Sequence, residues 1–142
     1  MENRIEVGTL ILRVVLGISF FIHGLSKFQG GIENTVGWFD SIGIPGFVAY
    51  AVATIELVGG ILLVIGLGTK IVSALLSLVL VGAIVKVKFA VGFLGNGQMA
   101  GYELDLAFLA MAIFLAINGS SLLSIDQIFS RKPEKTGNKA AA

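Results

Sequence analysis

Four stretches of apolar residues, separated by short glycine-rich or polar segments, dominate the pattern along the chain. They cover residues 7–28, 46–66, 70–91 and 102–117. A helix needs about 20 apolar residues to cross the hydrocarbon core of a bilayer. The segment from Val85 to Phe89 alternates like a strand, but a lone strand cannot span lipid, where its backbone polar groups would be unpaired. We therefore predict an all-α membrane protein, a bundle of four transmembrane helices.

Two shorter amphipathic segments and a polar tail complete the pattern. In the first connection, apolar residues recur at helical spacing beside Trp38, a residue type that favours membrane interfaces. A second short interfacial helix is expected around residues 122–129. We predict a single membrane domain over residues 1–130, followed by a basic, disordered cytoplasmic tail over residues 131–142.

The distribution of Lys and Arg near the helix ends predicts the orientation. The N-terminal segment carries Arg4, the turn between the second and third stretches leads into Lys70, and the C-terminal tail is basic. The other two connections carry only Lys27 at an edge and nothing basic beyond Lys88. Because cytoplasmic loops are enriched in Lys and Arg, we predict that both termini face the cytoplasm.

Composition and charge restrict the chemistry. Hydrophobic residues make up 56% of the 142 residues and charged residues 13%, about half the usual charged share of a soluble domain. The net charge of +1 indicates no nucleic-acid partner. The chain has no cysteine, which excludes disulfides, thiol catalysis and cysteine-ligated clusters. His23 is the single histidine, so a haem held by two histidines of one chain is excluded, and we predict no metal site.

Eight ionisable residues lie in or at the edge of the predicted spans, where an unpaired charge costs at least about 2.5–3.5 kcal/mol. They are Arg13, His23, Lys27, Glu56, Lys86, Lys88, Glu103 and Asp105. At about 1.5 Å per residue, the ones on the first, third and fourth stretches, apart from Arg13, share one layer in the outer half of the bilayer. Glu56 lies deeper and Arg13 nearer the cytoplasmic side, so we predict a buried structural pair between Arg13 and Glu56.

Several of these residues have an ordinary structural interpretation. Lys27, Lys88 and Glu103 lie where long side chains extend to the headgroups, and an acid in a first helical turn is favoured by the helix dipole. Lys86 and Lys88 are two apart, and the pattern does not decide which one faces the bundle. His23 favours a functional role, because it lies inside a predicted span and titrates near neutral pH.

Motifs on the first, second and fourth stretches, taken in this order, resemble the DoxX family of small four-helix membrane proteins over about residues 8–128. The residues that carry this resemblance are Arg13, Leu16, Gly17, Phe20, His23, Gly24, Lys27, Glu56, Gly59, Gly60, Gly101, Tyr102 and Glu103. The loop at residues 95–105 is most similar to a bacterial branch that carries an oxidoreductase label and is associated with resistance to catechols and quinones. The resemblance implies quinone chemistry in a bacterial inner membrane.

The leading hypothesis is a quinone- or catechol-linked oxidoreductase, or a subunit of one, that contributes to quinone detoxification or resistance to oxidative stress. His23, Glu56, Lys86 and Asp105 are the predicted catalytic residues, with His23 hydrogen-bonding a quinone oxygen. The predicted substrate-binding residues are Phe20, Lys27, Tyr102 and Glu103. No dinucleotide-binding glycine fingerprint is present, so the electron carrier would be a bound quinone, a flavin or a partner redox enzyme.

Two other hypotheses stay open from the sequence. One is a non-catalytic scaffold or assembly subunit for a redox enzyme, which the missing cofactor motif favours. The other is a transporter of aromatic compounds, which is weakened because no inverted repeat is evident. The pattern decides neither whether the chain catalyses a reaction by itself nor whether it forms a homo-oligomer.

Overall fold

The computed structural model describes residues 1–130, and within this range the chain is helical, with one isolated β-bridge between Gly95 and Ala100. The predicted tail, residues 131–142, lies outside the described residues. The helices are α1 (Glu2–Gln29), α2 (Ile32–Ser41), α3 (Phe47–Ile65), α4 (Thr69–Ala83), the π-helical turn η1 (Ile84–Lys88), the 3-10 turn η2 (Phe89–Val91), α5 (Glu103–Asn118) and α6 (Ile125–Ser130). The two short amphipathic helices expected from the sequence are present as α2 and α6.

Helices α1 and α3 form one tightly packed antiparallel pair. Glycines let the two backbones touch. A Cβ atom on Gly24 would overlap the backbone nitrogen of Leu57, and one on Gly60 would overlap that of Phe21. Small residues at such crossings allow close van der Waals packing, which drives helix association in a membrane.

Helices α4 and α5 form the second pair, and α3 leads into α4 through a tight turn. Gly66 and Gly68 adopt φ values of +72° and +63° there, a left-handed conformation that glycine adopts at little cost. The two pairs share a core of buried apolar residues. These are Leu16, Phe20, Leu63, Val72, Leu76, Leu80, Ala112 and Leu115.

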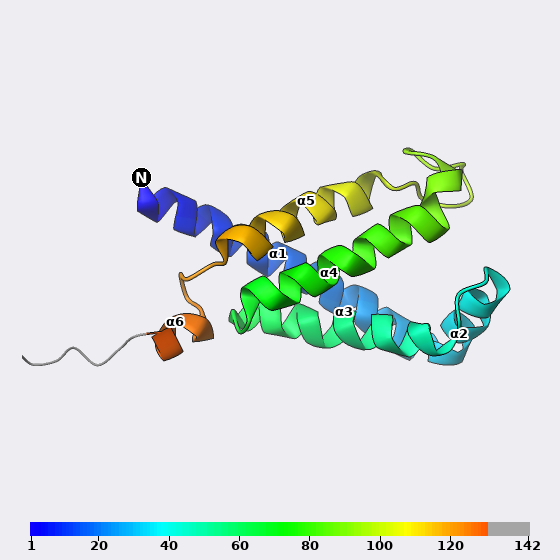
Figure 1. The fold of residues 1–142 in the computed structure, drawn as a ribbon, viewed down its shortest axis with the longest axis horizontal. Coiled ribbons are helices and arrows are strands. Elements are labelled where there is room, and N and C mark those ends of the chain that lie inside the picture. Colours follow the sequence, from blue (N-terminus) through cyan, green and yellow to red (C-terminus); the bar gives the residue numbers. More distant parts are fainter. Residues whose placement is uncertain (131–142) are drawn as a thin grey trace, which may run out of the picture.

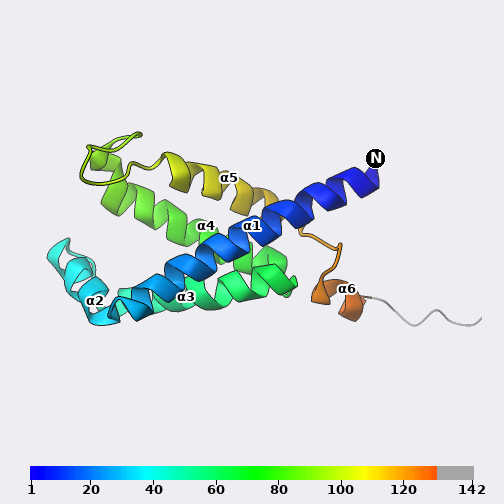
Figure 2. The ribbon, with the colours of Figure 1, turned by 180° about the vertical axis from the view of Figure 1, so that it is seen from behind.

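The bundle has two different ends. The α6 end contains the turn at residues 66–68, the segment 119–124 and α6; the α2 end contains α2, η1, η2 and the loop at residues 92–102. Figures 1 and 2 show the helix pairs meeting toward the α6 end and diverging toward the α2 end. The buried core agrees with this view, because α4 contributes no buried residue after Leu80 and nothing between residues 81 and 100 is buried.

Three helical segments are long and apolar enough to cross a membrane: α1, α3 and the continuous run Thr69–Val91. Large apolar side chains such as Ile11, Ile71 and Leu78 are more than half exposed on them, and a bilayer would cover these side chains with lipid. The chain is therefore a membrane protein of helical type. The predicted fourth span, α5, has 16 residues. At 1.5 Å per residue it is about 24 Å long, shorter than a hydrocarbon core of about 30 Å. The fourth span and the cytoplasmic location of the termini stay predictions.

Candidate functional site

The first ion pair of the α2 end joins α1 to α3. Lys27 Nζ lies 2.5 Å from Glu56 Oε2, and the Glu56 residue is only 7% exposed. The close contact of Gly24 with Leu57 places Lys27, one turn further along α1, within reach of the carboxylate. Lys27 Nζ also donates to the backbone oxygen of His23, at 3.5 Å. The ammonium group thus neutralises an acid in the middle of an apolar helix.

The second ion pair joins η1 to α5. Lys88 Nζ lies 2.5 Å from Asp105 Oδ2, and both side chains are partly buried. Asp105 sits in the first turn of α5, where the helix dipole favours an acid. Beside this pair, the Tyr102 ring stacks on Phe89 at 6.1 Å and meets the edge of Phe93 at 5.5 Å. The three rings form an aromatic cluster on residues next to this pair in the sequence.

The sequence pattern left open which of Lys86 and Lys88 faces the bundle, and the structure places Lys88 there. Lys88 binds Asp105, and the Lys86 side chain is exposed. The reason is the π-helical turn over Ile84–Lys88, whose wider winding shifts the side chains away from the α-helical register and is often found at functional sites. A chemical role for Lys86 stays a prediction.

The predicted pair between Arg13 and Glu56 is wrong. Arg13 is 1% exposed, and its guanidinium donates to the backbone oxygens of Leu123, at 2.9 Å, and Ser120, at 3.4 Å. It packs against Gly66. Glu56 precedes Gly66 by ten residues on α3, about 15 Å along the axis, and binds Lys27 instead. Arg13 therefore holds the segment 119–124 against α1.

The remaining predicted site residues fall into different environments. Phe20 is buried in the core with its ring 5.9 Å from that of Phe108, so it packs the bundle and does not line an open pocket. His23 lies one turn beyond Phe20 and is exposed, and Glu103 is exposed as well. Within residues 1–130 neither the His23 ring nor the Glu103 carboxylate has a hydrogen-bond partner.

Four of the eight ionisable residues thus form two separate ion pairs, one on each pair of helices, whereas His23, Lys86 and Glu103 are exposed. No hydrogen bond links the two ion pairs within the described residues. No group of three or more His, Cys, Asp or Glu side chains suited to a metal ion occurs in this part of the chain. Each ion pair offers an ammonium donor beside a carboxylate acceptor, which suits hydrogen bonding and proton exchange with an oxygen-bearing ligand.

The fold and the site define the class of protein: a small helical membrane protein with two ion pairs at one end. A family model described as DoxX matches residues 8–89, which include the Lys27–Glu56 pair and Lys88. The chain belongs to the DoxX family.

Similar proteins extend the match over the whole chain. A protein of Bacillus subtilis (strain 168) named "Putative oxidoreductase CatD" is 49% identical over 141 residues, 99% of this chain and all of that protein. "Uncharacterized membrane protein Rv3486" of Mycobacterium tuberculosis (strain ATCC 25618 / H37Rv) is 32% identical over 92% of this chain and 86% of its own length. "Inner membrane protein YqjF" of Escherichia coli (strain K12) is 27% identical over 93% of this chain and 99% of its own length. No solved structure matches the chain.

Proposed function

We propose that this chain is the membrane component of a quinone- or catechol-linked oxidoreductase and contributes to quinone detoxification. The observation that carries the proposal is the two lysine–carboxylate bridges, Lys27–Glu56 and Lys88–Asp105, whose ammonium groups are partly exposed at one end of an apolar bundle. Ionisable groups within membrane helices are costly, and they mark functional sites by default. The relative named as an oxidoreductase supports the same class of reaction.

The chemistry of a quinone fits such bridges. Reduction of a quinone to a quinol adds two electrons and two protons, one proton to each ring oxygen. A lysine ammonium stabilises the oxygen by hydrogen bonding as its charge develops, and the adjacent carboxylate passes a proton in either direction. The exposed imidazole of His23 on α1 is a further hydrogen-bond donor for a ring oxygen. The two electrons come from a flavin or from a partner redox protein.

The proposal includes the placement of the chain. It lies in a bacterial cytoplasmic membrane, with α5 as the fourth span and both termini in the cytoplasm. The basic residues near the termini and Lys70 support this orientation, and the relative named as an inner membrane protein supports the compartment. The two ion pairs then lie toward the outer face.

Fluorescence of Trp38 can report quinone binding, because Trp38 is the single tryptophan and lies on α2, at the same end as the ion pairs. The protein in lipid nanodiscs would be titrated with a short-chain benzoquinone, and quenching of Trp38 fluorescence would give the dissociation constant. We expect Lys27→Met and Lys88→Met each to weaken binding about tenfold, because a hydrogen bond from a charged donor contributes about 1.5–3 kcal/mol. His23→Gln tests the third donor.

Arg4→Met is the control, since Arg4 is an exposed base in the first turn of α1, at the other end of the bundle, and makes no ion pair in the described part of the chain. It should bind the benzoquinone like the wild type. Equal affinity in all four variants, or quenching that does not saturate, would contradict the proposal. A protein that binds no quinone but co-purifies with a redox enzyme in equal amounts would indicate a scaffold instead.

A further inference from the structure

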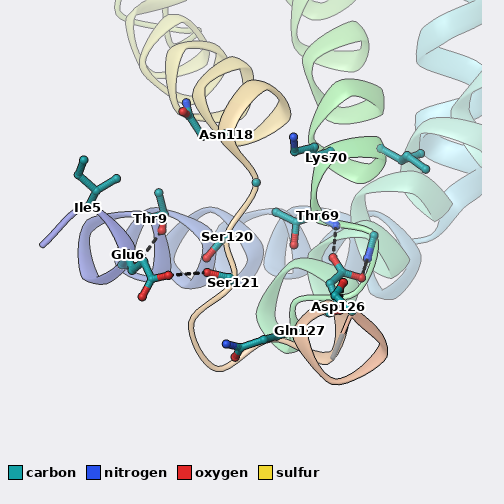
Figure 3. Close-up of a pocket in the computed structure, with 14 residues that line it drawn as sticks. Ile5, Glu6, Thr9, Thr69, Lys70, Asn118, Ser120, Ser121, Asp126 and Gln127 are labelled. Atoms are coloured by element: carbon teal, nitrogen blue, oxygen red, sulfur yellow. Dashed lines mark hydrogen bonds between the residues drawn. The ribbon is translucent and has the colours of Figure 1, made fainter. Parts of the chain in front are cut away.

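The two ends of the bundle present different surfaces. At the α6 end the surface is polar, and Figure 3 shows Glu6, Lys70, Asn118 and Gln127 on the elements that meet there. Such side chains are mostly found in contact with water. At the α2 end, the segment 92–102 between η2 and α5 contains no charged residue. The proposed quinone chemistry assigns no role to the exposed side chains of this segment, the 92–102 hairpin.

The 92–102 hairpin has a defined backbone conformation. Gly95 and Ala100 form an antiparallel bridge. Asn96 Oδ1 accepts hydrogen bonds from the backbone nitrogens of Gln98 and Met99, at 3.1 and 2.8 Å. A Cβ atom on Gly95 would overlap the backbone oxygen of Met99, so the two limbs of the hairpin lie in direct contact. This local pairing holds the side chains of the hairpin in defined positions.

The hairpin exposes large apolar side chains. Leu94 is 76% exposed, and Phe93 and Met99 are each more than 40% exposed. The adjoining helical turns carry side chains of the same kind, because Phe89 in η2 and Leu104 at the start of α5 are more than half exposed. A single exposed apolar residue needs no explanation, but an uncharged segment with several of them marks a surface that contacts an apolar partner.

The lengths of the two neighbouring helices place the hairpin at one edge of the bilayer. The start of α4 and the end of α5 lie level, because Gly119 lies against the Lys70 side chain. From that level the Thr69–Val91 run extends 23 residues, about 34 Å, and α5 extends 16 residues, about 24 Å. The hydrocarbon core is about 30 Å thick. The hairpin therefore connects a point just beyond the far edge of the core with a point just inside it.

We propose that the 92–102 hairpin is a membrane anchor, whose partner is the lipid of the adjacent leaflet. The side chains of Phe93, Leu94 and Met99 insert at the boundary between headgroups and acyl chains. The irregular backbone stays among the headgroups, where its peptide groups remain hydrated, and the limb that leads down to α5 is covered by protein, since Gly101 is buried. The hairpin thereby holds the start of α5 at the membrane surface.

Spin labels on the full chain in phosphocholine nanodiscs test the proposal. The chain has no cysteine, so Leu94→Cys and Met99→Cys each provide a unique site for a nitroxide. The measurement is the ratio of nitroxide collisions with oxygen, which concentrates in lipid, to collisions with a water-soluble nickel chelate. We expect a ratio about fivefold higher at Leu94 and Met99 than for a free nitroxide in water, because apolar side chains of interfacial segments lie about 5–10 Å into the boundary.

Gln98→Cys is the matched control, because Gln98 is an exposed polar residue of the same hairpin. Its label should collide mainly with the nickel chelate. The three labelled positions are exposed, so the label replaces no buried contact, and unfolding temperatures close to that of the unlabelled chain check that each variant is folded.

Preferential collision with the nickel chelate at Leu94 and Met99 would overturn the proposal, since the hairpin would then project into water. Equal ratios at all three positions would also overturn it, because insertion would not follow the apolar side chains. Protection of Leu94 and Met99 from both reagents would show that protein, such as a second copy of the chain, covers the hairpin instead of lipid. None of these outcomes depends on the ion pairs, so a failure here is distinct from a failure of the quinone site.

Discussion

The α6 end and the α2 end hold their helices together in different ways. At the α6 end, Arg13 binds backbone oxygens of the segment 119–124, and Asp126 binds backbone nitrogens at the start of α4. These side chains bridge elements that are far apart in the sequence. At the α2 end, Lys27–Glu56 and Lys88–Asp105 each join only the two helices of one pair.

The difference shows that the partner of a charged group decides its effect on the fold. Charged side chains that bind the backbone of a distant segment close one end of the bundle. Charged side chains that bind each other within a helix pair leave the two pairs free to separate, as they do toward the α2 end (Figure 1). An end whose helices are held only in pairs can admit a ligand between membrane helices at a low packing cost.

The largest effect on this contrast is expected from Arg13→Met. Methionine retains the unbranched apolar stem of arginine but lacks the guanidinium, so two hydrogen bonds from a charged donor are lost. The free energy of unfolding should therefore fall by about 3 kcal/mol. Hydrogen exchange should accelerate in residues 119–130 and stay unchanged in the 92–102 loop. Arg4→Met, an exposed arginine on the same helix, is the control. Unchanged exchange in residues 119–130 would show that Arg13 does not close this end.

A medium effect is expected from Gly24→Ala, which tests the close contact between α1 and α3, the two helices that run from one end of the bundle to the other. The new Cβ would overlap the Leu57 backbone, and such overpacking costs about 1–3 kcal/mol. The displaced α1 should also separate Lys27 from Glu56. Gly82→Ala is the matched control, because a Cβ at Gly82 would have no other atom within 4 Å, and it should be neutral or stabilising by about 0.5–1 kcal/mol. Equal losses in both variants would argue against backbone contact at Gly24.

The smallest effects are expected from double-mutant cycles on the ion pairs. Cycles with Lys27→Met and Glu56→Gln, and with Lys88→Met and Asp105→Asn, should each give a coupling of about 0.6 kcal/mol, the mean for interhelical hydrogen bonds in a membrane protein. The crossed cycle of Lys27→Met with Asp105→Asn should be additive within about 0.5 kcal/mol. A crossed coupling as large as the direct ones would mean that the two pairs act as one network, contrary to the division seen at the α2 end.

Much of the fold was predictable because the bilayer restricts it strongly. Apolar length alone identified α1, α3 and the Thr69–Val91 span, and helical spacing beside Trp38 identified α2. The prediction failed at Arg13, because its partners are backbone oxygens of Ser120 and Leu123. A backbone carbonyl carries no signature in the sequence, so pairing charges by depth led to Glu56 instead.

The sequence by itself determined that this is a helical membrane protein of the DoxX family, and which ionisable residues its spans contain, because hydrophobic length and residue type are local properties. The tertiary structure decided which of those residues meet. The close crossing of α1 and α3 at Gly24 places Glu56 beside Lys27, and the π-helical turn places Lys88 beside Asp105. Both ion pairs depend on how whole helices are rotated and how closely they approach. One extra residue in a helical turn, or one methyl group at a helix crossing, is enough to change this arrangement.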